Sequence, residues 1–225
     1  MCGRFTLTDT DNISSRFNIT NSVNISEKIT SHYNIAPTQI IPVIYKDENQ
    51  ENRIEFRKWG LVPFWAKDPK IGYGMINARA ETLAQRPSFK HLIKSKRCIV
   101  PSSGFYEWKR IDKLKVPYYI GVKDIKMFSF AGLYDNWKYN AGNELKTFTI
   151  ITTDANNTLK PIHNRMPVIL EKEFEEKWLD IKTQDFDSLK QMLTPYPDDK
   201  MIAYTVSIEV NNPKNDNPEL IRKAN

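Results

Sequence analysis

The cysteine at position 2 stands out for the chemistry it would gain if the residue before it were removed. The chain begins MCGRF, and loss of Met1 gives Cys2 a free α-amine beside its thiol. An α-amine has a pKa of about 7.7 to 8.0 and a lysine about 10.4, so far more of the α-amine is neutral and nucleophilic at pH 7. This amine can form a Schiff base with an aldehyde, onto which the thiol can close as a five-membered ring. Cys2 is therefore a candidate for covalent aldehyde capture; the alternative is a small, idle residue in a loose terminus.

A glutamate in PSSGFYEWKR is a candidate proton donor and acceptor. The stretch has the composition of a strand, whose period of two puts Glu107 on the face opposite Trp108. Ring formation needs several proton transfers, which a carboxyl with a pKa raised by apolar neighbours can perform near neutrality. The alternative is an ordinary glutamate on the polar side of a half-buried strand.

The stretch INARAET sets Asn77, Arg79 and Glu81 within five positions. Asn is a preferred N-cap residue, so Asn77 could begin the helix that we expect to follow. The Glu or Gln of a capping box is missing three residues on, where Ala80 stands. Two interpretations of Asn77 therefore stay open: a helix N-cap and a functional amide.

A second candidate for proton transfer is His163 in KPIHNRMPVIL. It lies between Pro161 and Pro167, and prolines fix backbone angles, so we expect its ring to have a definite direction. An imidazole near a reacting centre can shuttle protons or polarise an oxygen. The alternative is a histidine that hydrogen-bonds a loop together.

An aromatic and proline cluster, WGLVPFWAKDPK, contains Trp59, Phe64 and Trp65. Such clusters are typical of a core, but exposed aromatic side chains beside a basic groove stack on bases or wedge into a duplex. We expect Trp65 to be exposed.

Composition favours one soluble domain that meets a polyanion. The 225 residues, 40% of them hydrophobic, suffice for a single domain over residues 1–225. The net charge is +6 and the pI is near 9.1, with the basic residues scattered apart from the cluster FKHLIKSKR. No apolar run is long enough for a membrane span or a secretion signal, so we expect a cytoplasmic protein, associated with the nucleoid if bacterial. In that compartment a disulfide between Cys2 and Cys98 is not expected.

Several runs rich in β-branched and aromatic residues predict strands. They are residues 40–46, 52–60, 97–108, 116–123, 127–135, 146–153, 165–170 and 202–210. Apolar residues three or four apart predict helices over 79–96, with a break or kink at Pro87, over 171–180 and over 186–194, with shorter turns of helix at 11–17 and 155–160. This order favours an α+β fold: a single domain with a strongly curved, barrel-like, mainly antiparallel β-sheet and a few flanking helices.

No cofactor or metal is expected. The sequence has no phosphate-binding glycine loop, no dinucleotide fingerprint and no zinc-type spacing of Cys and His, and its only histidines are His32, His91 and His163.

Eight motifs in order resemble the SOS response-associated peptidase (SRAP) family, the abasic-site-processing proteins. The motifs run from Cys2 to about Ile221: MCGRF, YNIAPTQ, WGLVPFWAKD, INARAET, KRCIVPSSGFYEW, ITTDAN, PIHNRMPVIL and NNPKNDNPELI. The resemblance implies a protein that recognises abasic sites in single-stranded DNA and captures the sugar aldehyde on Cys2 as a thiazolidine. It also implies an autopeptidase activity, ranked second, that removes Met1.

The resemblance further implies a role for each matching residue. Asn77 would hold the sugar and the terminal amine, Glu107 would move protons during ring closure, and His163 would assist sugar opening and reversal of the crosslink. The DNA-binding set would be Arg4, Trp65, Arg79, Arg86, Trp108 and Thr152. Phosphate contacts of this kind supply affinity without reading sequence. We expect a monomer.

Two other functions stay open. A glutamine amidotransferase with an N-terminal nucleophile also begins with Cys-Gly once Met1 is lost, but the Gly-His-Thr-Arg and Asn-Gly elements of that class are missing here. A non-catalytic module for single-stranded DNA would use the basic charge and the aromatic residues and leave Cys2 incidental.

Overall fold

The computed structural model describes residues 2–20, 29–139, 142–183 and 185–224. Its centre is a closed ring of five strands, because β10 pairs with both β4 and β9 and so joins the two ends of the order β4, β3, β6, β9. The ring strands are β3 (Ile40–Lys46), β4 (Asn52–Trp59), β6 (Arg97–Ser102), β9 (Phe128–Tyr139) and β10 (Asn143–Asp154). Only the β4–β10 pair in this ring is parallel. The prediction of a barrel-like, mainly antiparallel sheet is confirmed.

The length of β10 lets it serve two parts of the molecule. Its first half pairs with β9 and β4 in the ring, whereas its last residues pair with β5 (Asn77–Arg79) and β11 (Arg165–Pro167). Ile150 lies in register with Asn77, and Thr152 with both Arg79 and Pro167. Two candidate stretches, INARAET and HNRMP, are thereby brought to one end of the barrel.

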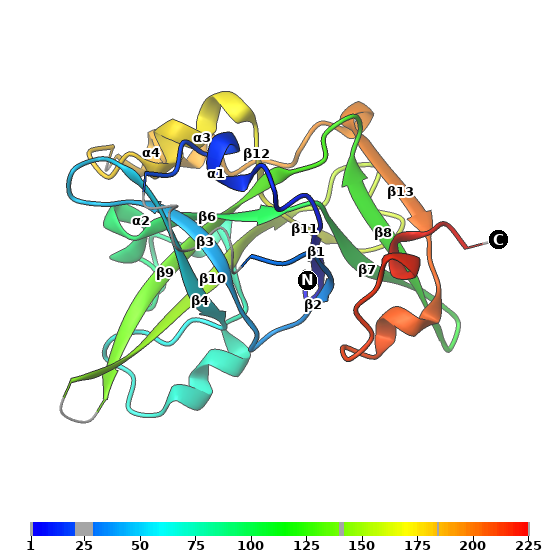
Figure 1. Cartoon of the computed structure of the whole chain (residues 1–225), viewed down its shortest axis with the longest axis horizontal. Helices are drawn as coiled ribbons and strands as arrows, with labels where there is room; N and C mark the ends of the chain where they lie inside the picture. The colour runs from blue at the N-terminus through cyan, green and yellow to red at the C-terminus, as the bar shows by residue number, and fades with distance from the viewer. Residues whose placement is uncertain (1, 21–28, 140–141, 184, 225) are drawn as a thin grey trace.

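A second, antiparallel sheet has the order β13, β8, β7, β1, β2. These strands are β1 (Phe5–Leu7), β2 (His32–Ile35), β7 (Gly104–Ile111), β8 (Leu114–Val122) and β13 (Met201–Thr205). In Figure 1 the strands β1 and β2 lie between the barrel strands and the group β7, β8 and β13. The Phe5 ring fixes β1 to the barrel, with its centroid 5.2 Å from that of Trp59 and 5.8 Å from that of Phe130. Aromatic burial at Phe5 thus holds the start of the chain against the barrel.

The helices are short and lie outside the sheets. They are α1 (Ile13–Arg16), α2 (Leu92–Ser95), α3 (Lys172–Leu179) and α4 (Phe186–Lys190), and β12 (Ile169–Leu170) pairs with β9 just before α3. Trp178 of α3 is buried and donates from Nε1 to the carbonyl of Cys98 at 2.9 Å, which joins this helix to the barrel. The helices expected near residues 11–17 and 171–180 are confirmed.

The helix predicted over 79–96 is wrong. Arg79 ends a strand, a 3₁₀ turn covers Ala80–Thr82, and an α-helix forms only over Leu92–Ser95. Pro87 lacks an N–H and restricts the residue before it, so separate turns replace a continuous helix. Residues 155–160 likewise form a hydrogen-bonded turn instead of a helix.

The strands predicted over 97–108 and 202–210 are each interrupted. Residues 97–108 form β6 in the barrel and β7 in the second sheet, with the break at Ser103. Gly104 at the start of β7 leaves room for the Tyr119 side chain, because a Cβ there would stand 2.1 Å from the Tyr119 hydroxyl. Residues 202–210 divide into β13 and a 3₁₀ turn at Ile208–Asn211.

Candidate active site

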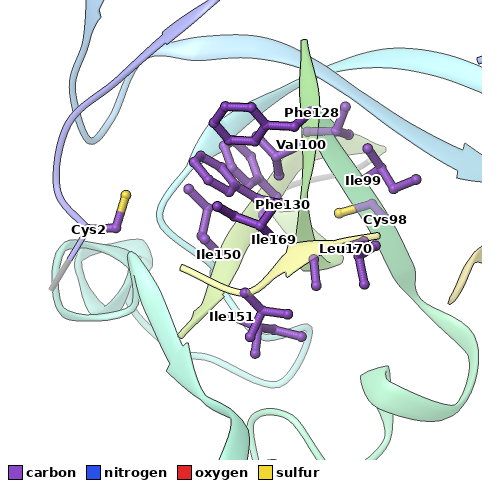
Figure 2. Packing of buried hydrophobic residues seen from close by; sticks show 14 of the residues in the cluster. Cys2, Cys98, Ile99, Val100, Phe128, Phe130, Ile150, Ile151, Ile169 and Leu170 are labelled. Atoms are coloured by element: carbon purple, nitrogen blue, oxygen red, sulfur yellow. The ribbon is translucent and has the colours of Figure 1, made fainter. Parts of the chain in front are cut away.

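Cys2 lies against the barrel with its side chain fully buried. Its carbonyl oxygen accepts a hydrogen bond of 2.7 Å from Nδ2 of Asn77, which fixes the backbone at the start of the chain. Burial raises the pKa of the Cys2 thiol well above its usual range, and the negative charge of Glu107 raises it further. The buried sulfur is therefore a neutral thiol. Cys98 is also a free, buried thiol, and Figure 2 shows the two cysteines on opposite sides of the cluster around Phe130.

Asn77 reaches Cys2 from β5, so the helix-cap alternative is wrong. The short strand pairs with β10 in parallel, and this pairing sets Asn77 opposite Ile150. With Nδ2 on the Cys2 carbonyl, the side-chain oxygen Oδ1 is buried and has no hydrogen-bond partner among the described residues. Burial of an acceptor without a hydrogen-bond donor costs free energy. Oδ1 is therefore placed to accept a hydrogen bond from an N–H or O–H group of a reactant.

Glu107 approaches Cys2 from the second sheet, on β7. Only 3% of it is exposed, and this burial raises the pKa of its carboxyl. Nearby His163 and the backbone N–H of Trp108 act in the opposite direction and stabilise the charged form. A carboxyl whose pKa is raised by burial suits general acid–base catalysis, and the Cys2 thiol with which it interacts lies beside it.

His163 has a fixed ring orientation. Its Nδ1 lies 3.0 Å from the backbone nitrogen of Arg165 and 3.2 Å from the carbonyl oxygen of the same residue, and these contacts hold the ring in place. His163 and Glu107 line one cavity of about 640 Å³. The structure thus brings Cys2, Asn77, Glu107 and His163 together, although they come from four separate stretches of the chain.

A second cavity, of about 520 Å³, is lined in part by Asn77. Trp65, Arg79 and Arg86 line it, and Trp65 is 48% exposed, which confirms the expectation for that residue. Both arginines are exposed. This side combines an aromatic face with two cations, a combination suited to bases and phosphates.

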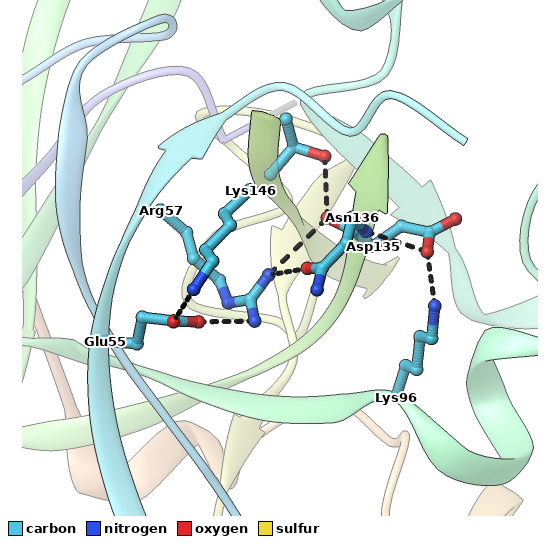
Figure 3. Close-up of polar contacts among 7 residues, drawn as sticks. Glu55, Arg57, Lys96, Asp135, Asn136 and Lys146 are labelled. Carbon is cyan, nitrogen blue, oxygen red and sulfur yellow. Dashed lines mark hydrogen bonds and ion pairs between the residues drawn. The ribbon is translucent and has the colours of Figure 1, made fainter. Parts of the chain in front are cut away.

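The loop that carries Trp65 is fixed by Asp135, a residue that sequence reasoning missed. Asp135 is 1% exposed, and its carboxylate accepts from the Phe64 backbone N–H at 2.8 Å and from Lys96 Nζ at 2.6 Å. Figure 3 shows the Lys96–Asp135 pair beside the network in which Arg57 binds Glu55 and Asn136. Trp137 Nε1 also donates to the carbonyl of Ala66 at 2.7 Å. The position of Trp65 is therefore set from the barrel.

Arg4 is bound by its own chain. Its Nη1 donates to the side-chain oxygen of Asn34 at 2.7 Å and to the carbonyl of Val210 at 2.8 Å, and its guanidinium lies 5.9 Å from the Trp108 ring centroid. Asn34, also missed, donates to three carbonyls of the C-terminal segment, those of Val210, Asn212 and Asn215. Asn34 belongs to the motif YNIAPTQ, which was the available signal in the sequence. The sequence alone does not show which segment this motif contacts.

Thr152 is buried, and its carbonyl contacts Arg165, whose pairing with Glu81 sequence reasoning missed. Arg165 binds both carboxylate oxygens of Glu81 at 2.9 Å and donates to the Thr152 carbonyl at 2.8 Å. This contact links the 3₁₀ turn after Asn77 to the segment that carries His163. Bidentate pairs fix geometry as well as charge, so the pair holds the two sides of the site in place.

A profile of the family described as "SOS response associated peptidase (SRAP)" matches residues 1–213. The chain belongs to this family. The SRAP resemblance predicted from the eight motifs is thereby confirmed.

Curated relatives and a solved structure agree with the SRAP assignment. The abasic site processing protein YoqW of Bacillus subtilis is 52% identical over 98% of this chain and 99% of its own length. The abasic site processing protein HMCES of Xenopus tropicalis is 35% identical over 86% of this chain and 66% of its own. A crystal structure of a protein from Bacteroides thetaiotaomicron, 33% identical, superposes with a TM-score of 0.90 and covers 99% of this chain and 100% of that one.

No group of three or more His, Cys, Asp or Glu side chains that could hold a metal occurs among the described residues. Within the same residues, no helix is long and apolar enough to cross a membrane.

Proposed function

We propose that this protein captures abasic sites in single-stranded DNA on Cys2, as a thiazolidine, after Met1 has been removed. The hydrogen bond from Asn77 to the Cys2 carbonyl carries the proposal, because it holds the position of the future α-amine beside Glu107. The relatives' names, which refer to abasic site processing, support DNA with abasic sites as the partner. The protein acts as a monomer, since every reacting group comes from one chain.

The reaction balances with the groups at the site. The α-amine attacks the C1 aldehyde of the opened sugar, and loss of water gives an imine. The Cys2 sulfur then adds to the imine carbon, the thiol proton passes to the nitrogen, and the ring closes. Aldehyde and aminothiol thus give thiazolidine and one water.

Each side chain has a step suited to its surroundings. Glu107, with its raised pKa, donates a proton to the departing hydroxyl, and during ring closure it takes the thiol proton and passes it to the ring nitrogen. The Oδ1 of Asn77 accepts from the amine and orients its lone pair. His163, beside Glu107 in the same cavity, protonates the sugar ring oxygen during opening and assists reversal.

DNA binding uses the two cavities beside Cys2. Arg79 and Arg86 contact phosphates and Trp65 stacks on a base on the Asn77 side, whereas Trp108 contacts a base on the Glu107 side. Arg4 supports Trp108 through its ring contact. Thr152, which is buried, shapes the sugar pocket through its backbone and its Oγ1.

Denaturing gel electrophoresis tests the proposal directly. A single-stranded oligonucleotide with one uracil is treated with uracil glycosylase and mixed with protein whose first residue is verified as Cys2 by mass spectrometry. We expect a slower, denaturant-resistant band that Cys2→Ala abolishes and Cys98→Ala retains. Salt-reversible binding that survives Cys2→Ala would instead indicate a non-catalytic module, and ammonia release from glutamine would indicate an amidotransferase.

We propose removal of Met1 by the chain itself as a second activity, supported by the word peptidase in the family's description. Met1 lies outside the described residues. The test is translation in a purified system without methionine aminopeptidase, followed by mass spectrometry. The wild type should lose Met1 and Cys2→Ala should keep it; retention by both would exclude self-removal.

A further inference from the structure

The β7–β8 hairpin extends the second sheet beyond Glu107 and Trp108. Its strands close at the pair Ile111 and Leu114 through a two-residue turn, in which Asp112 has a φ of 54°. A positive φ at the first turn residue is typical of the tight turns that match the twist of a hairpin. The hairpin is thus a regular extension of the sheet with a defined direction.

The charge on this hairpin is strongly one-sided. Between positions 109 and 115 there are four basic residues, Lys109, Arg110, Lys113 and Lys115, and a single acid, Asp112. Within the part of the chain that the structure describes, none of the four basic side chains forms an ion pair. The hairpin therefore presents cations without a counter-charge from the folded chain.

Two of these cations face each other across the strands. Arg110 and Lys115 are direct partners in the β7–β8 register, and both are exposed. Like charges in this position destabilise a sheet. A shared anionic ligand would remove the cost, since it would sit between the two cations.

Arg110 and Lys115 lie at the edge of the candidate active site. Arg110 and Lys115 line the same cavity as Glu107 and His163. Arg110 is three positions along β7 from Glu107, about 10 Å at about 3.3 Å per residue, and strand alternation puts it on the Trp108 face. The two cations therefore border the cavity at a distance from the reacting groups.

We propose that Arg110 and Lys115 bind backbone phosphates of the DNA strand on one side of the abasic nucleotide, the side that leaves past His163. The inference rests on the proposed function and extends it by assigning the hairpin to one flank. Arg79 and Arg86 line the other cavity and serve the opposite flank. The hairpin binds phosphate charge and reads no sequence.

The test separates the two flanks. Binding is measured by fluorescence anisotropy with three single-stranded oligonucleotides that carry a tetrahydrofuran abasic analogue, which has no aldehyde and cannot crosslink. One has nucleotides on both sides of the analogue, one only on its 5′ side and one only on its 3′ side. Arg110→Gln/Lys115→Gln is compared with the wild type and with Lys126→Gln/Lys182→Gln, a control that removes two exposed lysines from other surfaces.

We expect the hairpin variant to bind the two-sided oligonucleotide and one of the one-sided oligonucleotides more weakly, and the other one-sided oligonucleotide normally. Loss of two phosphate contacts should reduce the slope of log affinity against log salt by about 1.4 on the affected oligonucleotides. The thermal midpoint of the variant should equal or exceed that of the wild type, because a repulsive pair has been removed.

Unchanged slopes on all three oligonucleotides, or an equal loss on both flanks that the control also shows, would overturn the hairpin inference. The proposed function fails by a different observation, the absence of a denaturant-resistant adduct with aldehydic abasic DNA. The analogue oligonucleotides do not depend on that chemistry, so the two failures are distinguishable.

Discussion

Two walls meet at Cys2, and they differ in what their side chains can do. The β5 wall offers the Asn77 amide and, in the cavity beyond, Arg79 and Arg86, none of which changes charge near neutral pH. The β7 wall offers Glu107, a carboxyl whose pKa is raised by burial, and the segment before β11 brings the imidazole of His163 to the same cavity. The difference suggests a division of labour, in which one wall holds the reactants and the other moves protons.

The two walls also differ in how they are fixed. Asn77 is positioned by strand pairing with β10, and Trp65 nearby by the buried carboxylate of Asp135. Glu107 is positioned by the second sheet, which reaches the barrel through β1 and the Phe5 ring. A substitution on one wall should therefore leave the geometry of the other intact, so the comparison can be tested one wall at a time.

Glu107→Gln should have the largest effect. The amide keeps the size of the side chain but cannot exchange protons, so adduct formation should slow by about 100-fold, the lower end of the usual contribution of general acid–base catalysis. Rates from denaturing gels across the pH range should show, in the wild type, the titration of a carboxyl whose pKa is raised by burial; the variant should lose this titration. Glu48→Gln, on the exposed β3–β4 turn, is the control.

Glu107→Gln should also change how the stability of the fold depends on pH. Because burial raises the pKa of Glu107 above its ordinary value of 4.5, the folded state holds the proton more tightly than the unfolded state. This contribution to stability is complete at low pH and is lost as pH rises through the raised folded value. In urea unfolding, Glu107→Gln should gain stability relative to the wild type as pH increases; a difference that is constant with pH would contradict the assignment.

Asn77→Ala should act without changing the pH profile. Loss of its hydrogen bonds to Cys2 and to the amine should slow adduct formation by about tenfold, which corresponds to about 1.4 kcal/mol and to the net value of a well-placed hydrogen bond. The rate should fall by the same factor at every pH, in contrast to Glu107→Gln. A changed pH profile would mean that Asn77 sets the ionisation of its neighbours and would break the division between the walls.

The sequence predicted the barrel well because its strands carry their own signal. Runs such as 40–46 and 127–135 are dense in β-branched and aromatic residues, and a strand of that composition is stable wherever it pairs. The short strand β5 was missed, since three residues carry no periodicity and its pairing with β10 alone makes it a strand.

The residues of the candidate site, like the strands, were predicted only where the sequence carries a local signal. The family motifs identified Cys2, Asn77, Glu107 and His163 as residues of interest, and the structure brings them together. Supporting contacts such as Arg165 with Glu81 join positions 84 residues apart in the chain. Composition and spacing cannot reveal a contact of that range, because nothing local depends on it.

Asp135→Ala should weaken DNA binding through Trp65. The change removes the acceptor for the Phe64 N–H and the partner of Lys96, so the loop that carries Trp65 loses its fixed position. A stacked base is worth about 1 to 3 kcal/mol, and we expect a loss of about fivefold in affinity for analogue DNA, near the lower end. Trp65→Ala should give a similar loss, and the double variant should be no worse than either. Additive losses would show that Asp135 acts independently of Trp65.

Arg79→Ala should have the smallest effect and a distinct signature. Arg79 is exposed and is free of ion pairs within the described residues, so its removal leaves the fold unchanged and takes away one phosphate contact. The slope of log affinity against log salt should decrease by about 0.7, the single-strand value for one phosphate, with no change in the rate at saturating DNA. Arg4→Ala provides the contrast: its guanidinium is bound to Asn34 and Val210, so we expect a lower thermal midpoint and an unchanged slope. If Arg79→Ala left the slope unchanged, the β5 wall would hold only the sugar, and the phosphate contacts would have to come from the β7 wall and its hairpin.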